Sequence, residues 1–450
     1  MSKLWAIARQ TIAEGIRMKL ALVFLVLIGL IVVGLPFSIA GDSSLTGAVQ
    51  SFMSYGLTAT GVLLSMLTIF MSRSMADDLV RRQIFLIMTK PIARWQYVVG
   101  KWLGITLLNV AFLFCSAATM YGMVHYIKRT HPPIDAQFDA NELENEVLVA
   151  RHGLKCKLPD FTKPARQEFD RNIEQGYYDN IPDFDRVAEL RRLAQKHEIR
   201  WRMVGPQEMR VFEFENVLCD RSPDKTVQIR FMAEVSRYAP DEIFRSFWRA
   251  GDPQKGTPTY DISVRHMVGR YHSIPIPADA VAPDRTLTVY FHNYNPYPGE
   301  PQFANIIEFR KADEVTVFFT VGSFEWNLVR LLTLMLCKLM FLGATAILMT
   351  TVFSFPVACL ASFTVYVLAG TRSFIGEALD LASDDFASLF SSLQEFFLQS
   401  FAYVYHMLFW IVPDFAKYDA VEPFVNGQNV GLVWVLNAVF WLVLVKTVIV

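Results

Sequence analysis

The sequence of 450 residues lacks the motifs of a nucleotide-hydrolysing or metal-dependent enzyme. It contains no GxxxxGKS/T loop, the glycine-rich segment that binds the phosphates of ATP in P-loop ATPases. Its five cysteines form no CxxC pair and no cluster with histidine, which excludes the common zinc sites. The formal net charge of −1 provides no overall field that would attract nucleic acid. We therefore expect no enzymatic activity, no cofactor or metal, and no nucleic-acid partner.

Cysteine is scarce, and only Cys156 and Cys219 lie in the polar middle of the chain. These two would form a disulfide if the middle segment folded in an oxidising compartment, but no spacing rule fixes their geometry. The other three lie in apolar segments, where buried free thiols are common. The sequence leaves both states of Cys156 and Cys219 open.

Charge is absent from several long runs, of which the first, Leu20–Ala40, has 21 residues. A cleavable signal peptide has an apolar core of about 7–15 residues, whereas about 20 are needed to cross a bilayer. Apolar residues make up 53% of the chain and gather in two blocks, 1–127 and 324–450. We therefore predict an α-helical integral membrane protein without a cleavable signal peptide. A β-rich, sandwich-like α+β domain at 128–325 is expected between its third and fourth transmembrane helices.

About six transmembrane helices are predicted, because backbone groups inside a bilayer must be hydrogen-bonded within helices. Their ranges are 20–40, 48–72, 102–127, 326–350, 353–369 and 430–450. The stretch 393–412 is either a seventh span or an interfacial or re-entrant helix. We favour the second interpretation because polar residues recur along it, within an extracytoplasmic or interfacial segment at 370–429. The chain ends inside the last predicted span, so the sequence leaves open whether a tail follows.

Basic residues predict the orientation, since short cytoplasmic loops carry an excess of lysine and arginine. The tail 1–19 carries four basic residues against one acid, and the loop 73–101 carries six against two. The loop 41–47 carries only Asp42. We therefore expect a multi-pass protein of the plasma (inner) membrane, with the tail and the loop 73–101 in the cytoplasm and 128–325 outside.

The first residues, 3–18, show helical periodicity. One face carries Trp5, Ala8, Ile12 and Ile16, and another carries Lys3, Gln10, Glu14 and Arg17. This pattern predicts an amphipathic helix on the cytoplasmic surface, before the first span. The alternative is a plain continuation of that span.

The middle domain changes its period from helical to alternating at about residue 208. Apolar residues alternate with polar ones through Val227, Ile229 and Phe231, as in half-buried antiparallel strands. A surface helix is expected at 184–197, and the Asp183–Asp185 pair fits a helix cap or a solvated turn. Two histidines, His266 and His272, would share one strand face. None of these residues has the spacing of a catalytic or metal site.

The residue pattern of the loop 73–101 predicts a helical hairpin. Asp77 and Asp78 suit a helix start, Arg81 and Arg82 follow one turn later, and Pro91 would begin a second helix. Arg94 and Lys101 are expected to be exposed on that second helix. Such a hairpin could transmit force from a soluble partner, or its charges could only set the topology. The pattern alone leaves both interpretations open.

The same loop resembles the segment between spans two and three of ABC-2-type transporter permeases. The similarity lies in Lys90-Pro91-Ile92-Ala93-Arg94, followed by Tyr97, Gly100 and Lys101. Phrases near the C-terminus are also similar to large ABC-2-type permeases: Val321–Glu325 with Asn327 and Arg330, Phe353–Ala358, and Pro413–Phe415. The resemblance covers about 1–127 and 320–450, and not the middle domain.

The resemblance implies that the chain is the permease subunit of an ABC exporter whose ATP is hydrolysed by a separate subunit. The segment that would dock on that ATPase contains Arg81, Arg82, Gln83, Thr89, Lys90, Pro91 and Arg94. The implied partners are the ATPase and a second permease chain, in a homo- or heterodimer. Membrane lipids would contact the predicted spans, and the sequence leaves open whether the outer domain binds cargo or a periplasmic protein. The alternative is a membrane-anchored binding or sensing protein that uses its extracytoplasmic β-domain.

Two polar residues within the predicted spans form a candidate intramembrane polar site. Lys338 lies near the middle of the fourth span, where a charge costs roughly 2.5–3.5 kcal/mol on insertion scales. It would face a translocation cavity, bind a lipid head group, or extend along the helix to the interface. Asn109, in the third span, is expected to make an interhelical hydrogen bond.

Overall fold

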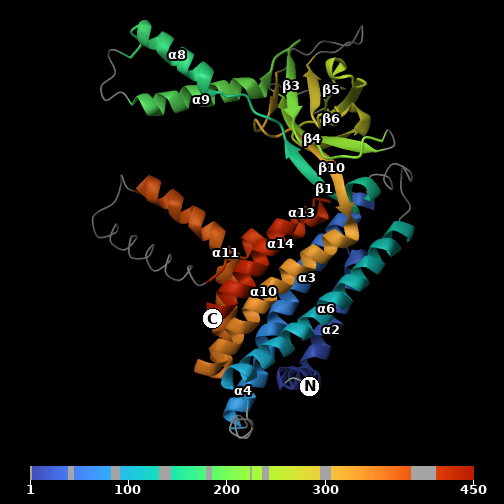
Figure 1. Cartoon of the computed structure of the whole chain (residues 1–450), viewed down its shortest axis with the longest axis vertical. Helices are drawn as coiled ribbons and strands as arrows, with labels where there is room; N and C mark the ends of the chain where they lie inside the picture. Colours follow the sequence, from blue (N-terminus) through green and yellow to red (C-terminus); the bar gives the residue numbers. More distant parts are fainter. Residues whose placement is uncertain are drawn as a thin grey trace. The chain divides into compact units, whose positions relative to one another are not determined.

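The computed structural model describes nine stretches of the chain, which form two compact units (Figure 1). The stretches are 3–38, 45–82, 92–130, 143–178, 185–222, 225–235, 243–293, 306–386 and 412–449. The helical unit comprises Met1–Ala150 and Gly322–Val450, and the β-unit comprises Arg151–Val321. The residues just before β1 therefore belong to the helical unit, although they were expected in the domain at 128–325.

The helical unit is built from two groups of helices that are separated in sequence by the β-unit. The first group is α1 (Lys3–Arg17), α2 (Leu20–Ser38), α3 (Leu45–Met71), α4 (Arg73–Val80), α6 (Arg94–Thr130) and the turn η1 (Leu143–Val147). The second is α10 (Phe324–Val352), α11 (Phe355–Phe386), η4 (Ala416–Tyr418), α13 (Val421–Val425), α14 (Leu432–Ala438), η5 (Val439–Lys446) and α15 (Thr447–Ile449).

Five helices of this unit are long and apolar enough to cross a membrane. They occupy Leu45–Val80, Arg94–Thr130, Phe324–Val352, Phe355–Gly376 and Leu432–Ile449. A sixth is present if α1 and α2, which meet at a bend of 68°, count as one broken span. The helix predicted at 353–369 is longer than expected, since α11 runs on to Phe386. The stretch predicted to be re-entrant, 393–412, lies outside the described residues except for Val412.

The helical unit is apolar on its surface as well as in its core. Only 17% of the apolar window of α11 is buried, against 61% in α10, which lies at the centre of the bundle. Large side chains such as Leu30, Leu360 and Val433 are 65%, 67% and 81% exposed. Contiguous exposed apolar surface of this extent is rare on soluble monomers.

The β-unit contains two antiparallel sheets. Its strands are β1 (Val149–Lys155), β2 (Met203–Val204), β3 (Met209–Phe214), β4 (Thr226–Val235), β5 (Ile243–Ala250), β6 (Tyr260–Met267), β7 (Tyr271–Pro277), β8 (Leu287–His292), β9 (Ile307–Phe309) and β10 (Thr316–Ser323). One sheet has the order β1-β10-β4-β9-β2, with β7 also paired to β4, and the other has the order β3-β8-β5-β6.

Aromatic side chains from both sheets meet around Trp248, which is 1% exposed. Its ring lies 4.7 Å from Phe231 of the first sheet and 4.9 Å from Phe291 of its own sheet. Within β3, the buried residues Phe212 and Phe214 flank the exposed Glu213. The predicted antiparallel strands are confirmed, and burial alternates in β3. The half-buried alternation predicted for β4 is wrong, because Gln228 is 6% exposed between Val227 and Ile229 and accepts a hydrogen bond from Arg151. The two sheets share one core.

Two helices of the β-unit, α8 (Thr162–Glu174) and α9 (Arg186–Arg202), pack together through Ala165, Phe169 and Leu193. The carboxylate of Asp185 accepts hydrogen bonds from the backbone N–H groups of Val187 and Ala188. It therefore caps α9, as the cap interpretation of the Asp183–Asp185 pair predicts. Asp183 itself lies outside the described residues.

The two cysteines of the β-unit, Cys156 and Cys219, are both free thiols. Cys156 is buried, and its thiol donates to the carbonyl of Ala312 at 3.4 Å. Burial raises the pKa of the Cys156 thiol to about 11, so it stays protonated and unreactive at neutral pH.

His266 is a buried titratable group in the β-unit, with 4% of its surface exposed. Its ring lies 5.1 Å from Phe231 and 4.4 Å from His272. The expectation of one shared strand face was wrong, because His266 is on β6 and His272 is on β7. Nε2 of His266 has no hydrogen-bond partner within the described stretches. Burial and then the neighbouring His272 lower the pKa of His266 to about 4.

This lowered pKa predicts an acid-sensitive β-unit. The unfolded chain binds a proton at His266 below about pH 6.5, whereas the folded chain does so only below about 4. The contribution of neutral His266 to the free energy of unfolding is therefore complete above pH 6.5. It falls by at most about 3 kcal/mol as the pH is lowered from 6.5 to 4. His266→Phe should remove most of this loss. The loss of stability is measured by hydrogen exchange of β4 and β7 in the full-length protein at several pH values. The same pH profile in His266→Phe as in the natural sequence would show that His266 does not cause the acid sensitivity.

Candidate functional site

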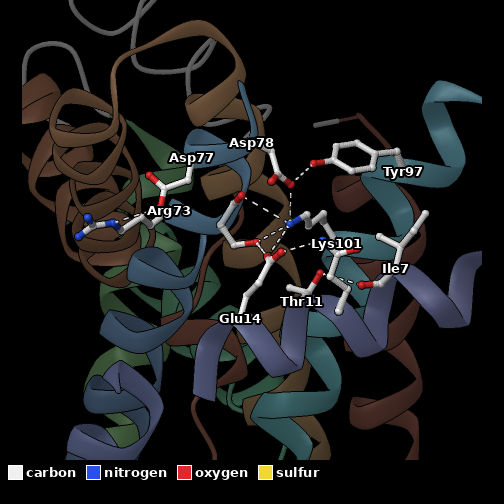
Figure 2. A network of polar contacts seen from close by, with 10 residues as sticks. Ile7, Thr11, Glu14, Arg73, Asp77, Asp78, Tyr97 and Lys101 are labelled. Atoms are coloured by element: carbon white, nitrogen blue, oxygen red, sulfur yellow. Dashed lines mark hydrogen bonds and ion pairs between the residues drawn. The ribbon is translucent and has the colours of Figure 1, made fainter. Parts of the chain in front are cut away.

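Lys101 is the centre of a buried ionic network at one end of the helical unit. It lies on α6 and is 1% exposed, so the expectation that it would be exposed was wrong. Its Nζ lies 2.8 Å from Glu14 Oε2, 2.8 Å from Asp78 Oδ2 and 2.6 Å from Ser74 Oγ. Figure 2 shows the ammonium group between the side chains of α1, α4 and α6.

Two hydroxyl groups complete the ionic network, which we define as Glu14, Ser74, Asp78, Tyr97 and Lys101. Tyr97 lies one turn before Lys101 on α6, is 1% exposed and donates a hydrogen bond to Asp78 Oδ2. Ser74 Oγ donates to Glu14 Oε2 at 2.7 Å. One ammonium group and two hydroxyl donors thus serve two carboxylates. Charged groups are stable in the interior only when they are paired in this way.

The network gives the two aspartates of α4 different roles from those predicted. They were expected at a helix start, but α4 begins at Arg73, directly after α3, and both lie in its second half. Asp78 is 3% exposed and bonds to Lys101. Asp77 faces outward and pairs with Arg73 at 3.6 Å. The prediction that both aspartates lie at a helix start, based on the helix dipole, was wrong. Asp78 is buried because it pairs with Lys101 of α6, which is distant in sequence.

Glycines let α1 lie directly against α6. A Cβ added at Gly104 would lie 2.6 Å from Thr11 Cβ and 2.9 Å from the carbonyl oxygen of Ala8. A Cβ added at Gly100 would lie 2.8 Å from Ile7 Cβ. Glycines four residues apart allow helix backbones to approach closely. This contact brings Glu14 within reach of Lys101.

The faces of α1 differ in part from the predicted ones. Ile7, Ala8, Thr11 and Gly15 are buried. Trp5 and Ile16, expected on one apolar face with Ala8, are 46% and 58% exposed. The small residues of α1 therefore pack inward, and two of its large apolar residues remain on the surface.

The predicted ATPase-docking residues begin and end next to the ionic network. Arg81 and Arg82 are exposed and follow α4 directly, three and four residues after Asp78. Arg94 is exposed and begins α6, three residues before Tyr97. Gln83, Thr89, Lys90 and Pro91 lie outside the described residues. The network therefore fixes both described ends of this segment to one another.

The predicted intramembrane polar residues are not brought together. Asn109 donates an interhelical hydrogen bond to Thr68 Oγ1 of α3 at 2.8 Å, as expected. Lys338 lies on α10, and its Nζ is 3.9 Å from Asp419 Oδ1. Neither residue belongs to the ionic network around Lys101.

The β-unit carries a separate groove of about 470 Å³ between α8, the end of α9 and the start of β3. Trp201 and Phe161 contribute aromatic rings to it, and Arg200 and Arg210 contribute cations. The Arg210 guanidinium lies 5.7 Å from the centre of the Trp201 ring. Burial lowers the pKa of Arg210, which nevertheless stays charged near neutral pH. Asp160 and Glu208 also line the groove, which therefore offers aromatic contacts and charges of both signs to a ligand of the β-unit.

The residues that sequence reasoning missed are Glu14, Ser74 and the buried roles of Tyr97 and Lys101. One signal was available, because Glu14 is the only acid before Asp42 and lies among basic residues. Among the residues that the structure describes, no group of three or more histidine, cysteine or acidic side chains could hold a metal ion.

Comparison with protein-family models, with curated proteins and with solved structures gives no match to this chain.

Gly104→Ala should displace α1 from α6, because the added methyl group would overlap with Thr11 and the backbone of Ala8. Overpacking of this kind costs about 1–3 kcal/mol. Gly122→Ala is a matched control on the same helix, since its Cβ would meet nothing within 4 Å. Hydrogen exchange and thermal unfolding in detergent should show faster exchange of α1 and a lower Tm for Gly104→Ala alone. Equal behaviour of the two variants would contradict the close packing.

Proposed function

We propose that this chain is the membrane-spanning subunit of an ABC-type exporter and that a separate ATPase subunit drives it. The observation that carries the proposal is the ionic network around Lys101. It joins α1, α4 and α6 at the point where the predicted ATPase-docking segment leaves and re-enters the helical unit. Transport would occur in the plasma (inner) membrane, with two permease chains forming the pathway.

Membrane insertion is supported by the exposed apolar helices. The windows of α11 and of Leu432–Ile449 are each 17% buried and are the least covered of the five. Lipid provides an apolar environment for such surfaces, whereas water does not. The basic residues of the loop 73–101 favour a cytoplasmic position for the end of the bundle that contains the ionic network.

Force transmission is supported by the stiffness of this end. A partner that pushes on Arg81, Arg82 or Arg94 acts on the ends of α4 and α6. Separating those ends would leave the buried charge of Asp78 unpaired and would remove one of the two carboxylates from Lys101, which costs several kcal/mol. The helices should therefore move as one body with α1, rather than bend independently. α4 follows α3 after the single residue Ser72, so the motion would also reach α3.

The proposal predicts that ATP hydrolysis co-purifies with the chain through the docking segment. The tagged protein is isolated from membranes of its own host in mild detergent, and vanadate-sensitive ATPase activity is measured in the eluate. We expect activity with the natural sequence and a loss of about tenfold or more in Arg81→Glu/Arg82→Glu, because both cations are exposed where an acidic partner surface would contact them.

A matched control is Arg191→Glu/Arg200→Glu on α9, which makes the same charge change at two exposed positions of the β-unit. Its co-purifying activity should equal that of the natural sequence. An eluate without any ATPase, or full activity in Arg81→Glu/Arg82→Glu, would contradict the proposal.

A second candidate function is a membrane-anchored binding or sensing protein. The groove of about 470 Å³ lined by Trp201 and Arg210 favours it, because aromatic rings beside charges of both signs suit a ligand with aromatic and polar groups. In that case Arg200→Glu should weaken ligand binding, and the docking-segment variants should have no effect.

A further inference from the structure

We propose that Lys338 is an anion-binding group that water reaches halfway across the membrane, and that Asp419 is its exchangeable partner. The ligand it fits is a carboxylate or phosphate group, carried by a lipid headgroup or by a free solute. The inference rests on the membrane position proposed above for the helical unit, but it does not require the ATPase.

The first observation is the depth of Lys338. It is the central residue of α10, fourteen residues from Phe324 and fourteen from Val352. At a rise of about 1.5 Å per residue, its Cα lies about 21 Å from either end of the helix. It is therefore as far as possible from both interfaces along this helix, and a lysine side chain is too short to reach either one.

Helix α11 indicates the same depth in the membrane for the segment that contacts Lys338. The backbone N–H of Phe415 donates to the carbonyl of Ala369 at 2.8 Å, and Ala369 lies fourteen residues from the start of α11 at Phe355. The ring of Phe415 lies 6.0 Å from the ring of Phe341 on α10. The segment that carries Asp419 therefore begins near the middle of the bundle.

From there the segment returns to the end of the bundle where α10 begins. Its only regular structure before α13 is the short turn Ala416–Tyr418. After α13, the carbonyl of Gln428 accepts a hydrogen bond from Asn327 at 2.8 Å, and the N–H of Val430 donates to Asn327 Oδ1 at 2.7 Å. Asn327 lies in the first turn of α10. Residues 412–430 thus run between mid-depth and one interface without crossing the bundle.

Two exposed side chains of the segment beside Lys338 are charged. The side chain of Asp419 is 59% exposed, and Lys417 is also exposed. Hydrocarbon tolerates neither exposed carboxylates nor irregular backbone, and such segments occur at membrane depth only beside protein or water. We infer that water enters along residues 412–430 from the end of the bundle near Asn327.

The pairing of Lys338 differs from that of Lys101. Lys101 lies within 2.8 Å of three side-chain oxygens and is fully buried. Lys338 is 21% exposed, and among the residues that the structure describes its Nζ lies within 4 Å of one carboxylate, the largely exposed Asp419 at 3.9 Å. Asp414 is a second acid whose charge acts on Lys338. Lys101 is held in a closed site, whereas the contact of Lys338 with Asp419 is long and open to solvent, and the main other contact of Asp419 Oδ1 is a weak hydrogen bond from the N–H of Val421 at 3.3 Å. Asp419 occupies the position that an anionic group of a ligand would take.

The test uses methanethiosulfonate reagents of opposite charge on the full-length chain, with the five native cysteines replaced by serine. Asp419→Cys, in sealed right-side-out vesicles, should react from outside. The anionic reagent should react roughly fivefold or more faster than the cationic one, because Lys338 has lost its counter-ion. Adding Lys338→Met should abolish this preference. Ala416→Cys, which keeps both charges, should also react and guards against a folding defect in the Asp419 variants.

Val367→Cys is the control for depth, because it lies two residues from Ala369 and is 44% exposed on the apolar surface of α11. It should not react. Reaction of Val367→Cys at the same rate as Ala416→Cys would overturn the membrane position and this inference together. If Val367→Cys is inert, two results overturn the inference alone: unreactive Ala416→Cys and Asp419→Cys, or no dependence of the charge preference on Lys338.

A bound anion should slow the reaction of Asp419→Cys with the anionic reagent, and this protection shows whether the anion is a free solute or a lipid headgroup. Slower reaction in the presence of inorganic phosphate assigns the site to a free anion. Slower reaction in nanodiscs that contain phosphatidylglycerol, compared with phosphatidylcholine alone, assigns it to an anionic headgroup. No protection by either would overturn anion binding at Lys338.

Discussion

The structure of the helical unit depends on one buried ammonium group, that of Lys101. Burying a charge is costly unless its hydrogen-bonding capacity is met by oppositely charged and polar groups. Here the compensating groups come from two other helices, as Glu14 on α1 and Asp78 on α4. The three helices can adopt no arrangement that separates these groups without leaving a charge unpaired. Their relative position is therefore fixed by electrostatics as well as by packing.

The ionic network explains why α1 belongs to the core of the proposed mechanism. Close packing at Gly100 and Gly104 brings α1 against α6, and Glu14 then reaches Lys101. A docking subunit would act on the ends of α4 and α6, which the ionic network holds rigidly together with α1. The contact of Lys338 on α10 is looser, since its Nζ lies 3.9 Å from the largely exposed carboxylate of Asp419. The proposed anion site would use this lysine, whereas Lys101 holds helices together.

Sequence reasoning located the helices and strands but not the network. Charge-free runs such as Leu20–Ala40 predict helices and the alternation in β3 predicts a half-buried strand, and both patterns are readable without the fold. The alternation in β4 did not predict its burial, because the polar Gln228 is buried as well. Lys101 was expected to be exposed, because periodicity cannot show that an acid 87 residues away neutralises it. Asp78 was assigned to a helix dipole for the same reason. Asn109 was predicted correctly, since a lone polar residue in a span requires an interhelical partner.

The charge of Lys101 can be tested directly by thermal unfolding in detergent. Lys101→Met should destabilise the helical unit by about 3–5 kcal/mol, because it leaves the buried carboxylate of Asp78 and the partly buried carboxylate of Glu14 without their cation. Adding Glu14→Gln and Asp78→Asn should recover at least half of that loss. Lys128→Met, which removes an exposed ion pair with Glu144 from the same helix, should cost less than about 1 kcal/mol. A Lys101→Met variant no less stable than Lys128→Met would contradict the account.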